Sequence, residues 1–334
     1  MSRGRQLFIV LTAVVVLSSA LNHALIRLLD IRTDVIDRGK ISPEASGPPV
    51  LVTGSSLTFF GISWRKISAT LQRPIMTRSV GGASPCELEP LLREVPEAGR
   101  LMIGVSIFDL NENNLSDSRA PLVPFAQTWN DLRATGTDWT ASKRILWMYP
   151  LPWLQHVFPL AGRSSSVMVN AREKVRALRP RPPAAEPESR LAFKTDEDSG
   201  HPEKLSDWDP GRVARNLSQL TASAFAQGRF SGPKSQALAR ILARAPHSEP
   251  TLLLVLPVSP PYREAFAGAA ARAEFERAIE KAKAGDPKLR VLRLDQDPAL
   301  QSADVFWDLV HLNDEGRRLA TGLVIDHLSA PPIR

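Results

Sequence analysis

Short apolar runs that alternate with helical stretches constrain the fold of this chain more than any other feature. The first run, at 50–53, follows two prolines and ends at Gly54. Further runs predict strands at 74–78, 100–106, 251–256 and 289–294, and residue spacing predicts helices at 62–71, 85–95, 211–227, 262–284 and 314–328. This alternation is typical of a mainly parallel sheet, so we predict an α/β three-layer sandwich.

The composition fits a globular domain with a sizeable core. The chain has 334 residues, of which 43% are hydrophobic, too many for a mainly disordered or fibrous protein. Cys86 is the only cysteine, which excludes an internal disulfide and a thiolate metal site, and we expect it to be buried at a helix start. The net charge of +7 comes from scattered arginines without a basic run interleaved with aromatic residues, so no nucleic-acid partner is predicted.

The N-terminus predicts a membrane signal. Two arginines among the first five residues precede an uninterrupted apolar run at 7–17, and the apolar pattern resumes at 24–29. A cleaved signal peptide and a retained anchor both fit such a run, and the resumed pattern favours an anchor at 1–30. Because arginines stay on the cytoplasmic side, we predict a single-pass protein of the cell membrane with residues 31–334 extracytoplasmic, or periplasmic.

A long stretch at about 111–245 interrupts the alternation and predicts an insertion or lid with its own helices. Its part at 129–158 is rich in large aromatic residues, and two prolines there break any long helix. These aromatics could stack on sugars or rest at a membrane surface, but packing into a core is favoured. The Arg- and Pro-rich run at 179–187 cannot build a core and predicts an extended, mobile segment.

Two short blocks carry the residues for nucleophilic chemistry. Gly54-Ser55-Ser56-Leu57 follows the first predicted strand, and Asp308-Leu309-Val310-His311 precedes the last predicted helix. A serine nucleophile needs a neighbouring base, and the base needs an acceptor that fixes its tautomer. We predict Ser56 as nucleophile, His311 as base and Asp308 as acceptor, at the carboxyl edge of the sheet. The alternative for Ser56 is a cap of the following helix.

These blocks resemble those of the SGNH (GDSL-type) hydrolase superfamily. The first block matches with Ser55 in place of the family's Asp, and the Asp-x-x-His block matches fully. The resemblance covers about 50–106 and 251–328 and implies an SGNH or flavodoxin-like sandwich. It also implies a Ser-His-Asp triad that requires no metal or organic cofactor. Histidines 156, 201, 247 and 327 lie in no motif and are expected to be structural or solvated.

The resemblance also implies donors for an oxyanion hole. The family's second block falls in 79–84, where we expect the backbone N–H of Gly82, with Gly81 as the alternative. The third block reads Gly104-Val105-Ser106 and lacks the family's Asn. The expected substitutes are Ser106, Asn111 and Asn113. Loss of one such donor costs on the order of a hundredfold to a thousandfold in turnover.

The anchored chain is similar to envelope proteins of this superfamily, including those of alginate O-acetylation and D-alanyl transfer to teichoic acids. This similarity implies a serine esterase or O-acyltransferase that acts on acyl esters of a cell-envelope or exported polysaccharide, with a membrane-bound acyltransferase as a candidate partner. One alternative is a non-catalytic scaffold or binding component of a polysaccharide assembly. Another is a phosphate-binding domain with an anion loop at 54–56, which lacks the Lys of a P-loop and leaves Asp308 and His311 unexplained.

Overall fold

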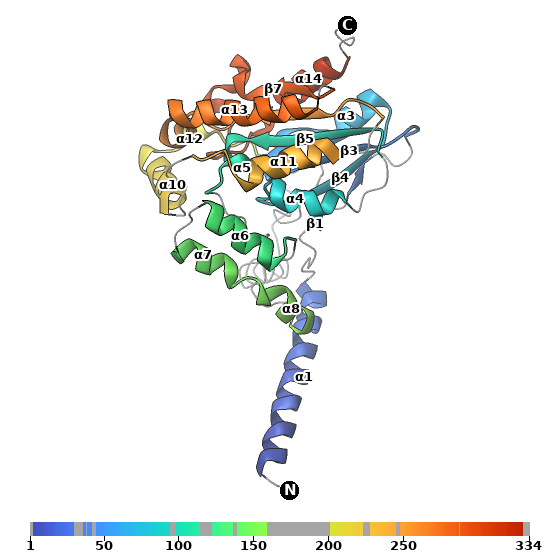
Figure 1. Ribbon diagram of the computed structural model, residues 1–334, viewed down its shortest axis with the longest axis vertical. Helices are drawn as coiled ribbons and strands as arrows, with labels where there is room; N and C mark the ends of the chain where they lie inside the picture. Colours follow the sequence, from blue (N-terminus) through green and yellow to red (C-terminus); the bar gives the residue numbers. More distant parts are fainter. Residues whose placement is uncertain are drawn as a thin grey trace, which may run out of the picture.

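A mixed, mostly parallel sheet of seven strands forms the centre of the structure (Figure 1), a computed structural model. The strands are β1 (Ile36–Asp37), β2 (Lys40–Ile41), β3 (Val50–Gly54), β4 (Ile75–Val80), β5 (Arg100–Ser106), β6 (Leu252–Leu256) and β7 (Arg290–Arg293). Their order is β1-β4-β3-β5-β6-β7, with β2 also beside β4. Strands β3 to β7 pair in parallel, while β1 and β2 run antiparallel to β4. The structure describes residues 3–29, 36–37, 39–41, 45–93, 98–113, 122–135, 139–158, 201–222, 228–244, 248–286 and 288–329.

The helices of the main body form two groups. One group consists of α4 (Pro85–Leu92), α11 (Pro233–Arg244) and α13 (Ala269–Gly285), in which α11 packs against both others. In the second group, α14 (Asp314–Ser329) packs against α2 (Ser56–Gly61) and α3 (Trp64–Leu71). The shorter helices α5 (Ile107–Leu110) and α12 (Pro260–Phe266) follow β5 and β6. Every residue of β3 and β6 is buried, as expected for parallel strands.

The structure confirms the five predicted strands and corrects several helices. The predicted helix at 262–284 is wrong, because the chain breaks at Ala267 and Gly268 and forms α12 and α13 instead. The helix predicted at 62–71 begins at Trp64, and α2, directly before it, was not predicted. Cys86 is buried in the first turn of α4, as expected.

The predicted insertion contains α6 (Phe125–Thr135), α7 (Trp139–Leu146), α8 (Pro150–Val157) and α10 (Pro210–Ala222). Its predicted end at about 245 includes α11, which packs with α4 and α13 as part of the main body. Helices α6 to α8 lie between that body and α1 (Arg3–Leu29) (Figure 1). The predicted mobile segment at 179–187 lies outside the described residues.

Helix α1 is long and apolar enough to cross a membrane. Its window Phe8–Leu25 has a mean hydropathy of 2.0, and none of that window is buried by the rest of the structure. A helix rises 1.5 Å per residue, so the 27 residues of α1 exceed the roughly 30 Å of a bilayer core.

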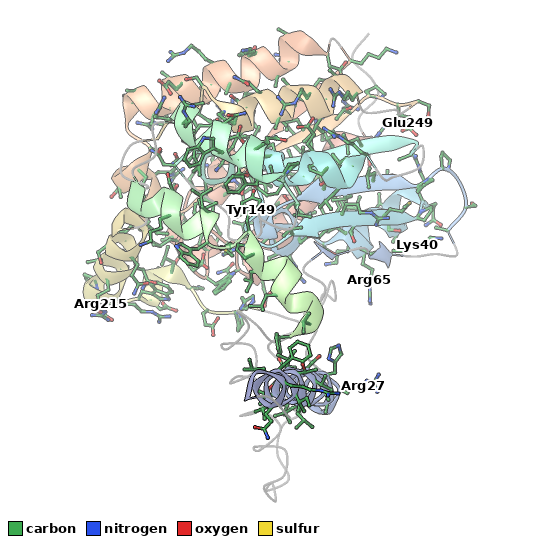
Figure 2. The ribbon with its side chains drawn as sticks, turned by 60° about the horizontal axis from the view of Figure 1, so that its bottom comes forward. Arg27, Lys40, Arg65, Tyr149, Arg215 and Glu249 are labelled. Atoms are coloured by element: carbon green, nitrogen blue, oxygen red, sulfur yellow. The ribbon has the colours of Figure 1, made fainter. Side chains whose placement is uncertain are left out.

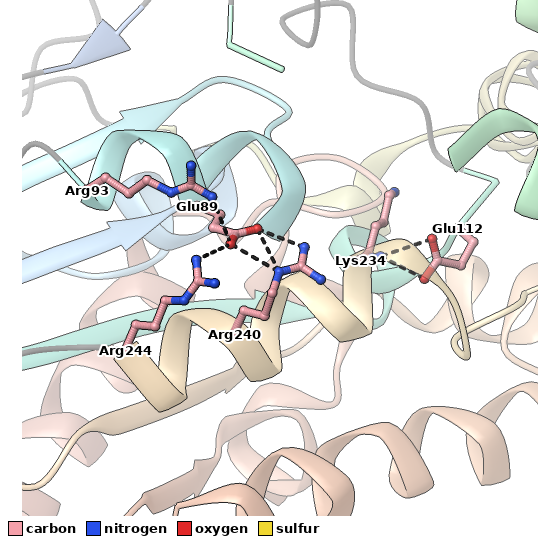
Figure 3. A network of polar contacts seen from close by, with 6 residues as sticks. All are labelled: Glu89, Arg93, Glu112, Lys234, Arg240 and Arg244. Carbon is pink, nitrogen blue, oxygen red and sulfur yellow. Dashed lines mark hydrogen bonds and ion pairs between the residues drawn. The ribbon is translucent and has the colours of Figure 1, made fainter. Parts of the chain in front are cut away.

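A cluster of charges joins α4 to α11 (Figure 3). The buried carboxylate of Glu89 accepts a bidentate pair of hydrogen bonds from Arg240, at 2.8 and 3.0 Å, and lies 3.2 Å from Arg244 and 3.3 Å from Arg93. Burial raises the pKa of Glu89, but hydrogen bonds and charge from Arg240 and Arg93 outweigh it, so the net pKa is lowered. The carboxylate is therefore ionised at neutral pH and fixes how the two helices pack.

Candidate active site

Strand β3 leads directly to Ser56 at the carboxyl edge of the sheet. Strand β3 ends at Gly54, and α2 begins at Ser56. The parallel register pairs Gly54 with Ser79, so the turn after β4, which contains Gly82, follows the same edge. Open parallel sheets place their ligands at this edge.

Two glycines allow α2 to pack directly on the strands. A Cβ atom at Gly54 would lie 2.0 Å from Thr58 Oγ1, and one at Gly104 would lie 2.2 Å from the same atom. Thr58 is fully buried in α2. The helix that carries Ser56 therefore rests on β3 and β5 at a distance that a larger residue at either position would prevent.

The helix cap is Ser55, so Ser56 keeps its hydroxyl for another purpose. Ser55 has extended backbone angles, and its Oγ accepts a hydrogen bond of 3.3 Å from the N–H of Leu57. The alternative interpretation of Ser56 as the cap is therefore wrong. The Oγ of Ser56 lies 2.9 Å from Nε2 of His311, 255 residues later in the chain.

His311 and Asp308 belong to a tight hairpin before α14. Phe306 and Leu312 pair as an antiparallel bridge, and the N–H of Trp307 donates to the carbonyl of His311 at 3.1 Å. Within the hairpin, Asp308 Oδ1 accepts hydrogen bonds from the N–H groups of Val310 and His311, at 2.8 and 2.7 Å. One carboxylate oxygen thus closes the turn.

The second oxygen of Asp308 orients the imidazole. Oδ2 lies 2.8 Å from Nδ1 of His311, so Nδ1 carries the proton and Nε2 is free to accept the hydrogen of Ser56. Burial raises the pKa of Asp308, but the hydrogen bonds and charge of His311 outweigh it and leave the pKa below its ordinary value. Ser56, His311 and Asp308 therefore form a hydroxyl–imidazole–carboxylate chain with an ionised carboxylate.

The hairpin is held from two sides. Asn313 donates through Nδ2 to the carbonyl of Asp304 at 2.7 Å and accepts at Oδ1 from the N–H of Gly316 at 3.0 Å. A Cβ atom at Gly316 would lie 2.2 Å from the carbonyl oxygen of Val305, which explains the glycine at that position. On the other side, the hydroxyl of Ser259 donates to the carbonyl of Leu309 at 2.7 Å.

The imidazole of His311 belongs to a closed set of four aromatic rings. Trp307 stacks on His311 with a centroid distance of 5.3 Å, and His201 stacks on the same indole at 4.2 Å. Phe60 meets the edges of both imidazoles, 5.9 Å from His311 and 6.2 Å from His201. The prediction that His201 is merely structural or solvated missed this proximity. Ring stacking leaves no spacing pattern in a sequence, so no sequence signal could have identified His201. In the structure its backbone N–H donates to Asp314 Oδ1, at the start of α14, at 3.0 Å.

The predicted oxyanion donors have different surroundings in the structure. Gly82 adopts a positive φ of 69°, which glycine tolerates, in the turn after β4. Ser106 is fully buried, and both its N–H and its hydroxyl donate to Asp109, so it is not placed as an oxyanion donor. Asn111 is buried too; its Oδ1 accepts from the N–H of Asn113, and its side chain interacts with Tyr262. Two of the third-block donors expected from the sequence, Ser106 and Asn111, are therefore engaged inside the protein.

Asp109 is a buried carboxylate beside the nucleophile turn. Its Oδ2 accepts hydrogen bonds from the N–H and hydroxyl of Ser106, both at 2.9 Å, and the hydroxyl of Ser55 interacts with the carboxylate as well. Burial raises the pKa of Asp109 to about 6, although Ser55 and Ser106 act to lower it. The carboxylate of Asp109, in α5 directly after β5, thus lies next to Ser55, the residue before the candidate nucleophile.

Asp109→Asn is expected to remove a fall in stability between pH 4 and pH 6. The ordinary pKa of 3.8 applies to the unfolded chain, so between 3.8 and about 6 the folded chain holds a proton that the unfolded chain has lost. Stability therefore decreases as the pH rises through this range. An amide does not ionise, so the variant should not lose this stability. Relative to the parent, its free energy of unfolding should increase by up to roughly 3 kcal/mol as the pH rises through this range.

The measurement is urea unfolding of both proteins at pH 4, 5, 6 and 7. Asp304→Asn is the control, because Asp304 is exposed and its hydrogen bonds with Ser206 and Ser302 place its pKa below the ordinary value. Parallel curves for Asp109→Asn and the parent would contradict the prediction.

Within the described ranges, His, Cys, Asp and Glu side chains form no group of three or more that could hold a metal ion. No model of a known protein family matches the chain, and no curated protein matches its sequence. The functional interpretation therefore depends on the motifs and on the geometry of the site.

Proposed function

We propose that this protein is a membrane-anchored serine esterase or O-acyltransferase of the SGNH type. The observation that carries the proposal is the hydrogen-bonded chain of Ser56, His311 and Asp308, with distances of 2.9 Å from Oγ to Nε2 and 2.8 Å from Nδ1 to Oδ2. An imidazole that accepts from a serine and donates to an ionised carboxylate is the arrangement that activates a serine for attack on an acyl group.

In the proposed mechanism, Nε2 of His311 takes the proton of Ser56 as Oγ bonds to the ester carbonyl carbon. The N–H groups of Ser56 and Gly82 bind the resulting oxyanion. Ser56 is the first residue of α2, and the first N–H groups of a helix have no intrahelical acceptor. His311 then gives its proton to the departing alcohol, which leaves an acyl-serine. Water or a sugar hydroxyl attacks that ester, loses its proton to His311, and restores the Ser56 hydroxyl.

The two helix groups support a three-layer α/β sandwich of the SGNH or flavodoxin-like kind. The arginines before the apolar window of α1 support a cytoplasmic N-terminus and hence a site outside the cytoplasm. We therefore propose an acyl ester of a cell-envelope or exported polysaccharide as substrate, with a membrane-bound acyltransferase as the donor when the reaction is a transfer. Nucleic acid has no part in this proposal.

Fluorophosphonate labelling of the full chain in detergent tests the proposed function. We expect one adduct, mapped to Ser56 by mass spectrometry, and hydrolysis of p-nitrophenyl acetate by the same protein. Ser56→Ala should abolish both, whereas Ser55→Ala should retain the label, because the hydroxyl of Ser55 caps α2 and interacts with Asp109 instead of with His311. Loss of a helix cap costs about 1 kcal/mol.

A non-catalytic binding component of a polysaccharide assembly is the second candidate. It is favoured by the internal engagement of Ser106 and Asn111, which leaves the third-block donor unassigned. A folded parent that takes no label and hydrolyses no ester would favour this candidate over the enzyme.

A further inference from the structure

The chain around α8 presents an unusually apolar surface. Trp147 is 70% exposed and Leu154 is 40% exposed. The sequence from 145 to 162 contains no Asp, Glu, Lys or Arg, although Arg144 and Arg163 flank it directly. We refer to residues 147–158 as the α8 ledge. Exposed apolar side chains in an uncharged segment indicate a surface that is covered by something other than water.

The ledge is fixed to the body of the protein at its first end. The hydroxyl of Tyr149, the residue before α8, donates to the carbonyl of Val123 at 2.8 Å and contacts Thr128 Oγ1. The ring of Phe125 meets the Tyr149 ring edge-on at 5.3 Å. The exposure of the ledge therefore belongs to a helix that is held in place. Among the aromatic residues of 129–158, Trp129 and Trp147 are exposed, so the expectation of packing into a core is wrong for these two.

The second end of the ledge is fixed to α1. The hydroxyl of Ser19 donates to the carbonyl of Val157, the last residue of α8, at 2.7 Å. Figure 1 shows α8 beside the upper part of α1, and in Figures 1 and 2 α8 lies between α1 and the main body. The ledge thus bridges the main body and the candidate membrane span.

The position of this contact along α1 sets the depth of the ledge. Ser19 lies six residues before Leu25, the end of the apolar window, which corresponds to about 9 Å along the helix. Helices that lie in a membrane interface bury their apolar side about 5–10 Å into the boundary between headgroups and acyl chains. The contact with Val157 therefore lies at interfacial depth when α1 spans the bilayer.

We infer that the α8 ledge is embedded in the interfacial zone of the same bilayer that α1 crosses, with lipid as its occupant. Helix α8 has eight residues and could extend only about 12 Å, too short to span. Trp and Tyr concentrate at the level of the headgroups, where an amphipathic ring is best solvated. Attachment through both α1 and the ledge would hold the domain in one orientation above the membrane. The inference depends on α1 as a span and is independent of the proposed enzyme activity.

Depth measurements with nitroxide labels test this inference. The full chain, with Cys86→Ala as background, is reconstituted into liposomes of phosphatidylcholine and phosphatidylglycerol. Single labels are attached through Trp147→Cys and Leu154→Cys, with Leu17→Cys in the span and Lys281→Cys on α13 as references, since Leu17 and Lys281 are both exposed. Power saturation by oxygen and by a neutral nickel chelate reports whether each label contacts lipid or water.

We expect oxygen-to-nickel accessibility ratios at Trp147 and Leu154 that are several-fold above the ratio at Lys281 and below the ratio at Leu17. Ratios equal to that of Lys281 would place the ledge in water and overturn the inference. Low accessibility to both reagents would show a protein cover, from a second copy or another chain, and would overturn it as well. A nickel-accessible label at Leu17 would remove its premise that α1 spans the membrane.

Discussion

Asp308→Asn is expected to slow fluorophosphonate labelling and ester hydrolysis by about 10⁴-fold while the protein stays folded. The amide oxygen can still accept the N–H groups of Val310 and His311, which close the hairpin turn in the parent. The amide NH₂ group that replaces Oδ2 would face Nδ1 of His311, and two donors cannot share that contact. The imidazole would then favour the tautomer with a proton on Nε2, which cannot accept the proton of Ser56.

Asp304→Asn is the matched control for this prediction. Asp304 belongs to the same segment, but its carboxylate accepts from Ser206 and Ser302 at the surface and does not contact the imidazole. Labelling of that variant should match the parent within a factor of about two. A labelling rate of Asp308→Asn within tenfold of the parent would show that the carboxylate does not orient the base.

Lys234→Met is expected to destabilise the fold by about 3–5 kcal/mol, the usual cost of removing one partner from a buried group of charges. Lys234 is 2% exposed at the start of α11, and its Nζ donates to the carbonyl of Asn111 at 2.5 Å. Burial lowers the pKa of Lys234, while the charges of Glu87 and Glu112 act to raise it. Without the ammonium group, these carboxylates would remain buried without that positive charge.

Urea unfolding of the full chain in detergent, followed by near-ultraviolet circular dichroism, measures this loss. Lys281→Met, an exposed lysine of α13, should change the free energy of unfolding by less than about 0.5 kcal/mol. Adding Glu112→Gln to Lys234→Met should recover part of the loss. The backbone N–H of residue 234 lies 3.0 Å from Glu112 Oε1 (Figure 3), so an amide at position 112 can still accept this hydrogen bond. Because the amide carries no charge, the double variant leaves no unpaired carboxylate at that position. A loss below 1 kcal/mol for Lys234→Met would contradict the prediction.

The predicted strands lie close to the observed ones, because a buried parallel strand is a continuous apolar run. Val50–Gly54 and Leu252–Leu256 are the clearest cases, and all of their residues are buried. The single helix predicted at 262–284 is wrong, because residue spacing stays helical on both sides of Gly268 although the backbone turns there. Spacing reports which face of a helix is apolar, and it does not report a change of direction between two amphipathic helices.

In the candidate site, too, some predictions agree with the structure and others do not. Ser56, His311 and Asp308 were predicted from the chemistry of nucleophilic catalysis, and the structure brings all three together. The oxyanion prediction for Ser106 failed because the capping interaction between Ser106 and Asp109 uses the donors that the prediction required. A hydroxyl near the end of a strand has several local partners, and only the backbone path decides among them.

By itself, the sequence determined the α/β class, the apolar N-terminal helix and the three residues of the candidate triad, because apolar periodicity and reactive side chains are local properties. Only the tertiary structure decided that Ser55 caps α2, that His201 and Trp307 stack beside His311, and that α8 contacts α1 through Ser19. These contacts join residues that are distant in the chain or that have several local options. Their outcome depends on packing over the whole fold, which no short segment of sequence encodes.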